Sequence, residues 1–178
     1  DLNKVAETGK VDYDKDFFGK MASLTVSGQL EGETFAMAYK KIYTFGPTFR
    51  AENSNTKTHA SEFWMIEPEI AFCDLNMDMD IMEDMLKYVV KYVLDNCPNE
   101  MEFFDKFVEK GLIEKLTKLI NSHFVRIDHK DVIKILKEAD VKWEFEPEYG
   151  EDIAKEHEKY ITEYFDGPVF IKNWPKDI

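Results

Sequence analysis

Two strand-like segments joined by a polar loop restrict the fold of this chain more than any other feature. The residue pattern predicts strands at residues 42–52 and 63–72, with residues 53–62 forming a long hairpin loop between them. Side chains alternate between the two faces of a strand, so Arg50 and Glu52 lie on one side of the first strand. We therefore expect an antiparallel hairpin whose charged side chains gather on one face.

The second strand divides its side chains into a charged face and an apolar face. One face carries Phe63, Met65, Glu67, Glu69 and Ala71, and the other carries Trp64, Ile66, Ile70 and Phe72. We expect the apolar face to pack on the core. If the loop closes symmetrically, Arg50 lies opposite Met65 and within diagonal reach of Glu67.

Two interpretations of the charged face remain open on the pattern alone. In the first, the hairpin is solvated and each of its ion pairs contributes at most about 1 kcal/mol. In the second, the face binds a ligand, because arginine presents a rigid fork suited to phosphate and glutamate accepts hydrogen bonds from an amine or ammonium. A ligand with a phosphate at one end and amino groups elsewhere fits the second interpretation.

The charge of the chain argues against nucleic-acid binding as its main activity. Its 178 residues suffice for one domain, or most of one, and carry a net charge of -13 with no Lys/Arg-rich tract. Proteins that bind nucleic acid usually present a basic surface that displaces counterions from phosphates. Any polyanion that this segment binds is therefore held by a few individual side chains and not by a basic surface.

The sequence shows no sign of a membrane protein or a secreted one. No run is long and apolar enough for a membrane span, and the first residues lack the pattern of a signal peptide. The two cysteines, Cys73 and Cys97, make neither a disulfide framework nor a zinc-binding spacing. We expect two reduced thiols in a cytoplasmic protein.

Helices and strands come mixed along the rest of the chain. We expect a loop over residues 1–20 and helices at 31–39, from an N-cap at Asp78 or Asp80 to Pro98, at 100–120, from an N-cap at Asp128 to 136, and at 151–165. We expect further strands at 23–30, 124–127, 142–145 and 169–171. This order predicts an α+β or mixed α/β protein with an antiparallel sheet.

The hairpin resembles motif 2 of the class II aminoacyl-tRNA synthetases. The matching letters are FRAE at residues 49–52, a polar loop containing His59, and EFWMIEPEIAF at residues 62–72. The longer run YTFGPTFRAENSNTKTHASEFWMIEPEIAF is similar to asparaginyl-tRNA synthetases, of the aspartyl and asparaginyl subgroup. Two more stretches, FFGKMASLTVSGQLEGE and YGEDIAKEHEKYITEYFDGPVFIKNWPKDI, extend the similarity to almost the entire chain.

The resemblance implies an α+β catalytic domain, mainly an antiparallel sheet flanked by helices. It implies a ligase that activates asparagine with ATP to asparaginyl-adenylate and then transfers it to tRNA. As the resemblance has it, Arg50 holds the α-phosphate and is the catalytic residue, Glu52 binds the adenine amino group, and His59 approaches the outgoing pyrophosphate. Phe49 or a neighbour packs on the adenine.

The resemblance also implies an asparagine site. Gln29 accepts or orients the α-amino group of the substrate, and Glu67 pairs with its ammonium charge. Glu62 is a second candidate for that pairing. ATP and magnesium are the implied cofactors, with the magnesium ligands expected outside this segment.

Two glycines favour asparagine over aspartate as the substrate. Aspartyl relatives carry a proline before the glutamine and a lysine three residues beyond it, where this chain has Gly28 and Gly32. The lysine pairs with the side-chain carboxylate of aspartate. Its absence, beside Glu31 and Glu33, disfavours a second substrate carboxylate and tolerates an amide.

The resemblance finally implies parts that this chain does not carry. We expect residues 1–178 to be an internal segment of the catalytic domain, with motif 1, motif 3 and the anticodon-binding domain lying outside it. The isolated chain is then expected to be inactive, and the full-length protein to be a homodimer that contacts tRNA mainly through the missing parts. Thr58 stands where relatives usually carry an arginine. The positive charge of that arginine, which would bind the β- and γ-phosphates, is therefore lost unless another residue supplies it.

Two alternatives to this function stay open. The first is a non-catalytic, synthetase-like interaction or regulatory module, and the second is a relative of the aspartyl-tRNA synthetases. The joint presence of Arg50, Glu52, Gln29 and Glu67 argues against the first, because a scaffold alone tolerates their loss.

Other histidines and methionines have simpler interpretations than metal binding. His157 lies between Glu156 and Glu158, but neighbouring helix residues point apart, and we expect an exposed polar helix there. His123 and His129 flank a short strand and are interpreted as a helix-end residue and a cap-region residue. The methionines of NMDMDIMEDM open an amphipathic helix and are expected to pack in the core. No metal site is therefore predicted within the chain.

Overall fold

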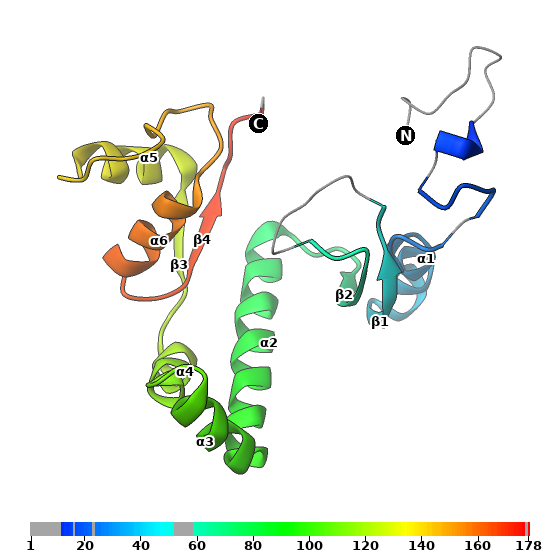
Figure 1. The fold of residues 1–178 in the computed structure, drawn as a ribbon, viewed down its shortest axis with the longest axis horizontal. Helices are drawn as coiled ribbons and strands as arrows, with labels where there is room; N and C mark the ends of the chain where they lie inside the picture. Colours follow the sequence, from blue (N-terminus) through cyan, green and yellow to red (C-terminus); the bar gives the residue numbers. More distant parts are fainter. Residues whose placement is uncertain (1–11, 16, 23, 52–58, 177) are drawn as a thin grey trace. The chain divides into compact units, whose positions relative to one another are not determined.

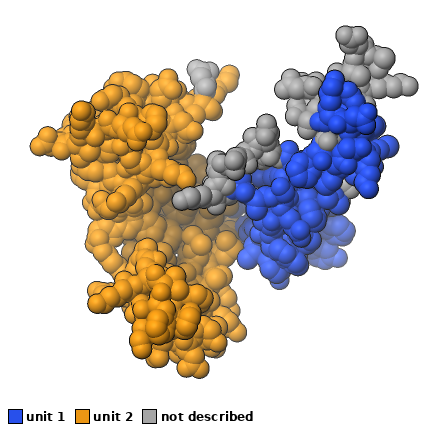
Figure 2. Space-filling model, viewed as in Figure 1, with its two compact units in different colours: residues 1–73 blue, residues 74–178 orange. Residues whose placement is uncertain are grey.

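Two compact units make up the chain, residues 1–73 and residues 74–178, here called unit 1 and unit 2 (Figures 1 and 2). The computed structural model describes residues 12–15, 17–22, 24–51, 59–176 and 178. Unit 1 holds the hairpin, and unit 2 holds five of the six α-helices found in the described residues. Of the loop expected over residues 1–20, the described part contains one 3₁₀ turn at Tyr13–Lys15.

Unit 1 is a helix packed on a two-stranded hairpin. Helix α1 spans Gln29–Tyr39, strand β1 spans Lys41–Phe49 and strand β2 spans Glu62–Ile70 (Figure 1). The two strands pair antiparallel, with Thr44 opposite Glu67. The expected hairpin and the expected helix are therefore confirmed.

The register of the hairpin differs from a symmetrical closure of the loop. The N–H of Arg50 donates to the carbonyl oxygen of Ser61 at 3.0 Å, so Arg50 lies opposite Ser61 rather than Met65. Gly46 takes the place opposite Met65. The predicted register was wrong because β1 already ends at Phe49, and the connection starts earlier than expected. The shift is an even number of residues, so the assignment of side chains to faces is unchanged.

The charged face of the hairpin is the covered face. Burial alternates along both strands, and the residues on the Glu67 side are the half-buried or buried ones. Helix α1 lies against this face. Gly32 allows the close approach, because a Cβ at that position would lie 3.4 Å from side-chain atoms of Ile42, Thr44 and Glu69.

The apolar face of the hairpin is the exposed face. Tyr43, Phe45, Trp64 and Ile66 are between 53% and 70% exposed. The rings of Phe45 and Trp64 contact each other, with 5.1 Å between their centroids. The prediction that this face packs on the core is wrong for unit 1, because α1 directly precedes β1 and returns across the opposite face.

A strained turn joins α1 to β1. Lys40 follows the helix with φ of 70° and ψ of −46°, a conformation that residues with a side chain rarely adopt. The N–H of Lys40 donates to the carbonyl oxygen of Ala36 at 2.7 Å. Its own carbonyl oxygen accepts from the N–H of Ala71 at 2.8 Å. These two bonds tie the end of the helix to the end of β2.

Residues 24–28 form an irregular segment, so the strand expected over 23–30 is wrong. One backbone hydrogen bond joins this segment to β1, from the N–H of Phe49 to the carbonyl oxygen of Thr25 at 2.9 Å. Its other long-range hydrogen bonds go to a carboxylate on β2 and to Arg50. The alternation of its side chains was a misleading signal, because side-chain bonds and not a strand ladder fix the segment.

Three helices open unit 2. Helix α2 spans Leu75–Asn96, α3 spans Pro98–Phe107 and α4 spans Leu112–Asn121. The N-cap of α2 is Asp74, whose carboxylate accepts from the N–H of Met77 at 2.9 Å. The predicted N-caps, Asp78 and Asp80, lie inside the helix, so that prediction was wrong. Pro98 occupies the first position of α3, where its missing N–H is not needed.

The single helix expected over residues 100–120 is two helices. Gly111 lies between them with φ of 86°, in the left-handed region that favours glycine. The carboxylate of Asp105 accepts from the N–H of Ile113 at 3.0 Å, so a side chain of α3 caps the first turn of α4. The apolar stripe continues across the break, and periodicity alone therefore missed it.

A parallel strand pair organises the end of unit 2. Strand β3 spans Val125–Asp128 and β4 spans Val169–Lys172, with helices α5 (His129–Glu138) and α6 (Lys155–Tyr164) between them in sequence. The strands expected at 124–127 and 169–171 and the helix expected after Asp128 are confirmed. The buried apolar cluster of this region consists of Val132, Ile133, Leu136, Ile153 and Ile161.

The strand expected at 142–145 is a loop that α6 holds in place. The carboxylate of Glu156 accepts from the N–H of Phe145 at 2.8 Å. The Nδ1 atom of His157 accepts from the N–H of Ala154 at 3.2 Å, and its Nε2 lies 2.8 Å from the carbonyl oxygen of Phe145. With 2% exposure, His157 is a buried structural residue, and the prediction of an exposed polar helix is wrong at this position.

The elements confirm the α+β class, with antiparallel strands and flanking helices. The parallel pairing of β3 with β4 is an addition that the sequence pattern did not reveal. His129 is the first residue of α5, so its prediction as a cap-region residue is confirmed, and its ring is buried in contact with the rings of Tyr149 and Trp174. None of the helices in the described residues has the length and hydropathy that crossing a membrane requires.

Substitution of Leu136 tests the core assigned to unit 2. Leu136 is fully buried in the apolar cluster, so we expect Leu136→Ala to lower the free energy of unfolding by about 2–5 kcal/mol. Urea unfolding followed by far-UV circular dichroism measures the change. Lys134→Ala is the matched control, because the Lys134 side chain on the same helix is 71% exposed. Equal effects of the two substitutions would contradict the assignment.

Candidate functional site

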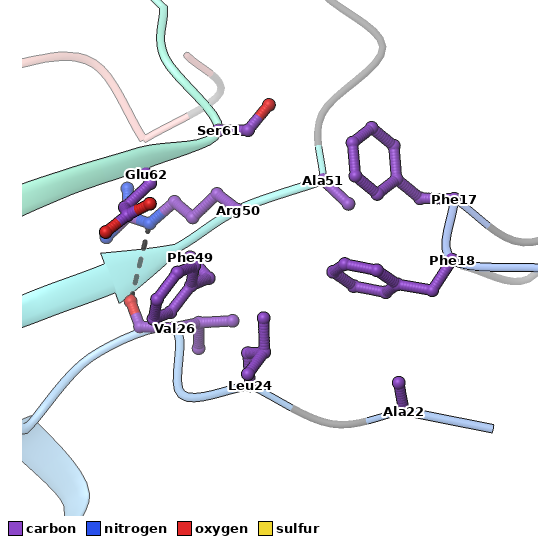
Figure 3. Close-up of a pocket in the computed structure, with 10 residues that line it drawn as sticks. All are labelled: Phe17, Phe18, Ala22, Leu24, Val26, Phe49, Arg50, Ala51, Ser61 and Glu62. Atoms are coloured by element: carbon purple, nitrogen blue, oxygen red, sulfur yellow. Dashed lines mark hydrogen bonds between the residues drawn. The ribbon is translucent and has the colours of Figure 1, made fainter. Parts of the chain in front are cut away.

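A cavity of about 490 Å³ opens in unit 1 where the two strands meet the N-terminal segment (Figure 3). Its lining residues are Phe17, Phe18, Ala22, Leu24, Val26, Phe49, Arg50, Ala51, Ser61 and Glu62. In Figure 3, Phe17 and Phe18 lie on one side of the cavity, with Arg50 and Glu62 on the other. The cavity therefore combines an aromatic wall with one cation and one anion.

Arg50 has no carboxylate partner among the residues that the structure describes. Its Nε lies 3.5 Å from the carbonyl oxygen of Val26, and its Nη2 lies 3.8 Å from the sulfur of Met65. The ring of Phe63 lies beneath the guanidinium, 5.3 Å from Cζ to the ring centroid. Both polar contacts are weak, so the fork of Arg50 keeps donors that a phosphate can use.

Glu67 is held by three hydrogen-bond donors. Its Oε1 accepts from the hydroxyl of Ser27 at 2.5 Å. Its Oε2 accepts from the N–H of Gly28 and from the hydroxyl of Thr44, each at 3.0 Å. The bond from Ser27 and then that from Gly28 lower the pKa of Glu67 below its usual value, against the opposing effect of burial, and the charge of Arg50 also contributes. Glu67 therefore stays ionised at neutral pH.

The same face becomes more acidic beyond Glu67. Burial, followed by the charges of Glu33 and Glu67, raises the pKa of Glu69. The side chain of Gln29 donates to the carboxylate of Glu33 at 3.0 Å. A cation is favoured beside these carboxylates, and a second anion is not.

Ser27 links Gln29 to Glu67. The N–H of Gln29 donates to the Ser27 hydroxyl at 3.0 Å, and that hydroxyl donates to Glu67. Gln29 lines a separate depression of about 530 Å³, together with Ser27 and Glu33. Ser27 thus joins the backbone of Gln29 to Glu67, whereas the side-chain amide of Gln29 donates to Glu33.

The other predicted residues divide between the two faces of the hairpin. Glu62 pairs with Phe49, so both lie on the face opposite Glu67, although both line the cavity with Arg50. His59 is exposed, and two residues separate it from the start of β2. Glu52 and Thr58 lie outside the described residues.

Sequence reasoning missed three contributors to this site, namely Ser27, which donates to Glu67, and the residues Phe63 and Thr44. Phe63 lies on the Glu67 face beside Arg50, whereas the expected aromatic residue, Phe49, lies on the other face. Strand alternation contained the signal for Phe63, because it shares a face with Glu67. Thr44 carried no comparable signal, since only the observed register shows that it is opposite Glu67.

A family comparison covers nearly the whole chain. Residues 4–178 match the model of the tRNA synthetases class II (D, K and N). The chain belongs to this family. The expected resemblance to class II synthetases is thereby confirmed, and the hairpin with Arg50 and Glu67 is the part of the chain where motif 2 was expected.

Individual relatives point to the asparaginyl branch. The asparagine–tRNA ligase of Acholeplasma laidlawii is 62% identical over 181 residues, which cover 100% of this chain and 39% of the relative. That of Clostridium beijerinckii is 54% identical over 176 residues, which cover 98% of this chain and 38% of the relative. The chain therefore spans well under half the length of these curated relatives.

Solved structures agree with the family in fold. The asparaginyl-tRNA synthetase of Pyrococcus horikoshii, complexed with asparaginyl-adenylate, has a TM-score of 0.70 and 33% identity, covering 90% of this chain and 35% of its own. The asparaginyl-tRNA synthetase of Entamoeba histolytica, in complex with asparaginyl-adenylate, has a TM-score of 0.69 and 26% identity, covering 87% of this chain and 34% of its own. The chain thus has the fold of part of these enzymes.

Removal of the Ser27 hydroxyl tests the network around Glu67. We expect Ser27→Ala to raise the pKa of Glu67 toward its ordinary value of 4.5, because the largest favourable interaction of the carboxylate is lost. Titration of carbon-13-labelled glutamate carboxylates by NMR measures the shift. Ser61→Ala is the control, since Ser61 lines the cavity without bonding to Glu67. An unchanged titration in Ser27→Ala would contradict the network.

The same substitution changes how stability depends on pH. A carboxylate whose pKa is lowered in the fold stabilises it above the ordinary value of 4.5, and this contribution is lost as pH falls through the folded value. We therefore expect unfolding measurements to show a smaller loss of stability below about pH 4.5 in Ser27→Ala than in the unsubstituted chain. A larger loss of stability in Ser27→Ala than in the unsubstituted chain would contradict the prediction.

Proposed function

We propose that this chain supplies the motif 2 part of an active site that joins asparagine to its tRNA through asparaginyl-adenylate, consuming ATP. The observation that carries the proposal is that two charged groups lie on one face of the hairpin. The guanidinium of Arg50 has donors available, and the carboxylate of Glu67 is held in place by hydrogen bonds. The names of the relatives support asparagine, and two structural neighbours hold asparaginyl-adenylate.

The proposed first step needs no nucleophile from the protein. A carboxylate oxygen of asparagine attacks the α-phosphorus of ATP, the bond to the β-phosphate oxygen breaks, and pyrophosphate leaves with the electron pair. The protein positions the reactants and neutralises the charge that grows on the α-phosphate oxygens. In this proposal Arg50 donates to those oxygens, and His59 approaches the pyrophosphate.

The nucleotide base is proposed to stack beside the phosphate-binding cation. Phe63 presents an aromatic ring next to Arg50 on the Glu67 face, and such a ring is a surface on which adenine stacks. Glu52 is proposed to accept from the adenine amino group, as the family resemblance implies. The ring on the other face, Phe49, is the less suitable of the two aromatic residues.

Glu67 is proposed to bind the ammonium group of asparagine. An ionised carboxylate offers about four acceptor sites, and three of those on Glu67 are used within the chain. The remaining site can accept from the substrate ammonium, with Gln29 as its neighbour across Ser27. Glu62 faces away from Glu67, so we assign it to the cavity around Arg50 and not to this contact.

Selection of asparagine over aspartate is proposed to follow from Gly32. This residue is buried against the hairpin, and a Cβ on it would lie 3.4 Å from side-chain atoms of Ile42, Thr44 and Glu69. The glycine places no cation at this position, and a side chain there would begin in contact with these three residues. With Glu33 and Glu69 nearby, the site offers no cation to a second carboxylate and accommodates an amide instead.

Magnesium is the cofactor that the family implies beside ATP. No group of three or more His, Cys, Asp or Glu side chains in the described residues is arranged to hold a metal ion. Those residues therefore do not fit a magnesium site, and no step of the proposed reaction is assigned to a metal held by them. When bound to ATP, magnesium neutralises phosphate charge.

The remaining proposals concern the whole enzyme. Because the chain spans 39% of the length of the Acholeplasma laidlawii relative, we propose that residues 1–178 form part of a catalytic domain that needs further parts for activity. We propose that tRNA is bound mainly by those parts, given the net charge of -13 here. We also propose that the whole enzyme is a homodimer in the cytoplasm, because the resemblance to the family implies it.

A chimera tests the function directly. We replace the matched region of the Acholeplasma laidlawii enzyme by residues 1–178 and measure asparagine-dependent ATP–pyrophosphate exchange. The chimera is expected to be active, and Arg50→Ala is expected to lower its rate about 100-fold or more, because one charge-stabilising donor is lost. Lys41→Ala is the control, since Lys41 is exposed on the opposite face of the same strand.

Three results would count against the proposal. Full exchange activity in Arg50→Ala would remove Arg50 from the reaction. A folded but inactive chimera would favour a non-catalytic module. Robust exchange by the isolated chain would show that no further parts are needed. If the chimera fails to fold, thermal unfolding of the isolated chain with an asparaginyl-adenylate analogue tests ligand binding instead. We expect the analogue to raise the melting temperature of the unsubstituted chain and not that of Arg50→Ala.

A further inference from the structure

Two of the donors that hold Glu67 converge on the same oxygen. The N–H of Gly28 and the hydroxyl of Thr44 both donate to Oε2 at 3.0 Å, and the Ser27 hydroxyl donates to Oε1. A carboxylate oxygen offers about two acceptor sites, so Oε2 is filled and the open site lies on Oε1. Gly28 and Thr44 together therefore determine where the open site of Glu67 points.

Gly28 and Thr44 also fit each other sterically. A Cβ built on Gly28 would lie 2.6 Å from Oγ1 of Thr44 and 2.9 Å from its Cβ. These distances are shorter than van der Waals contact, and the atoms belong to a short side chain on a paired strand that has little freedom to move. Any side chain at position 28 would therefore displace the hydroxyl that holds Glu67.

A proline at position 28 would disrupt this arrangement twice. It has no N–H to donate to Oε2, and its ring begins with the Cβ that collides with Thr44. The φ of Gly28 is −89°, so the glycine is required for its missing side chain and not for an unusual backbone. Proline at position 28 and threonine at position 44 are thus mutually exclusive in this geometry.

We propose that Gly28 and Thr44 are a pair of positioning residues that fix Glu67 so that its open acceptor site meets a nitrogen donor of asparagine. This rests on the proposed function. Neither residue touches the substrate in this scheme, and both act through Glu67. The glycine that distinguishes SGQ here from SPQ in aspartyl relatives therefore belongs to a two-residue unit with Thr44.

The physical role of the pair is to hold the carboxylate in one orientation before the substrate binds. The terminal torsion of a glutamate side chain is broad, so a carboxylate without its two Oε2 bonds samples many orientations. Ordering it would then oppose binding of asparagine. ATP binding does not depend on this torsion, because the phosphate contact is assigned to Arg50.

Kinetics of the chimera separate positioning from general structure. Thr44→Val keeps the shape of the side chain and removes its hydroxyl, and we expect it to raise the KM for asparagine about tenfold while the KM for ATP is unchanged. Thr44→Ser restores the hydroxyl and is expected to restore the KM for asparagine. An unchanged KM for asparagine in Thr44→Val, or an equal rise for both substrates, would overturn the proposal.

The steric half of the pair has its own test. Gly28→Ala is expected to raise the KM for asparagine at least as much as Thr44→Val, and Thr44→Gly added to it is expected to recover part of the loss by removing the collision. Gly167→Ala is the matched control, because a Cβ there meets its nearest neighbour, Ser122, at 3.8 Å. Additive effects of the substitutions at positions 28 and 44 would contradict a coupled pair.

A titration of the isolated chain tests the pair without any activity. NMR of labelled glutamate carboxylates is expected to show a higher pKa for Glu67 in both Thr44→Val and Gly28→Ala than in the unsubstituted chain, because each loses a donor to the carboxylate. An unchanged Glu67 titration in both variants would overturn the pair. An inactive chimera with the expected titration would instead count against the proposed function and leave the pair supported.

Discussion

The carboxylate of Glu67 is the interaction on which the rest of unit 1 depends. It joins a strand residue, Thr44, to the turn before α1 through Ser27 and Gly28. This single group therefore fixes the position of the irregular segment, the start of the helix and the side chains that face each other across the hairpin. A buried or half-buried carboxylate needs such donors, since an unsatisfied charge away from water is costly. The charged face is consequently the one that the helix covers.

Much of the local structure was predictable because short-range signals carry it. The hairpin follows from alternation in two segments, and the helix after Asp128 follows from its position before an apolar repeat. Arg50 and Glu67 share a face in both the expected and the observed register, since the two registers differ by an even number of residues. The pattern did not decide between a solvated hairpin and a ligand site, and the proposal of a ligand site rests on the family match.

Three of the wrong predictions share one cause, which is that side chains outside the segment decide its local conformation. The segments at 24–28 and 142–145 have strand-like letters, but Glu67 and Glu156 hold their backbones through side-chain bonds. His157 looked exposed beside two glutamates, yet both of its ring nitrogens bind backbone groups in a buried position. The partner of segment 24–28 lies 39 residues away at Glu67, and those of segment 142–145 lie 11 or more residues away on α6, so the letters of each segment do not reveal them. The same reason explains why Thr44 escaped notice as part of the site.

The turn at Lys40 has a consequence for how unit 1 moves. A residue with a side chain persists at φ of 70° only where its surroundings leave it no alternative, and here hydrogen bonds to Ala36 and Ala71 do so. Swinging α1 away from the sheet would break the bond between Lys40 and Ala71, because that bond joins the helix end to the end of β2, whereas the bond to Ala36 lies within the helix. The end of the helix is therefore fastened to the end of β2 at this corner, which limits how far α1 can move from the hairpin face that carries Glu67.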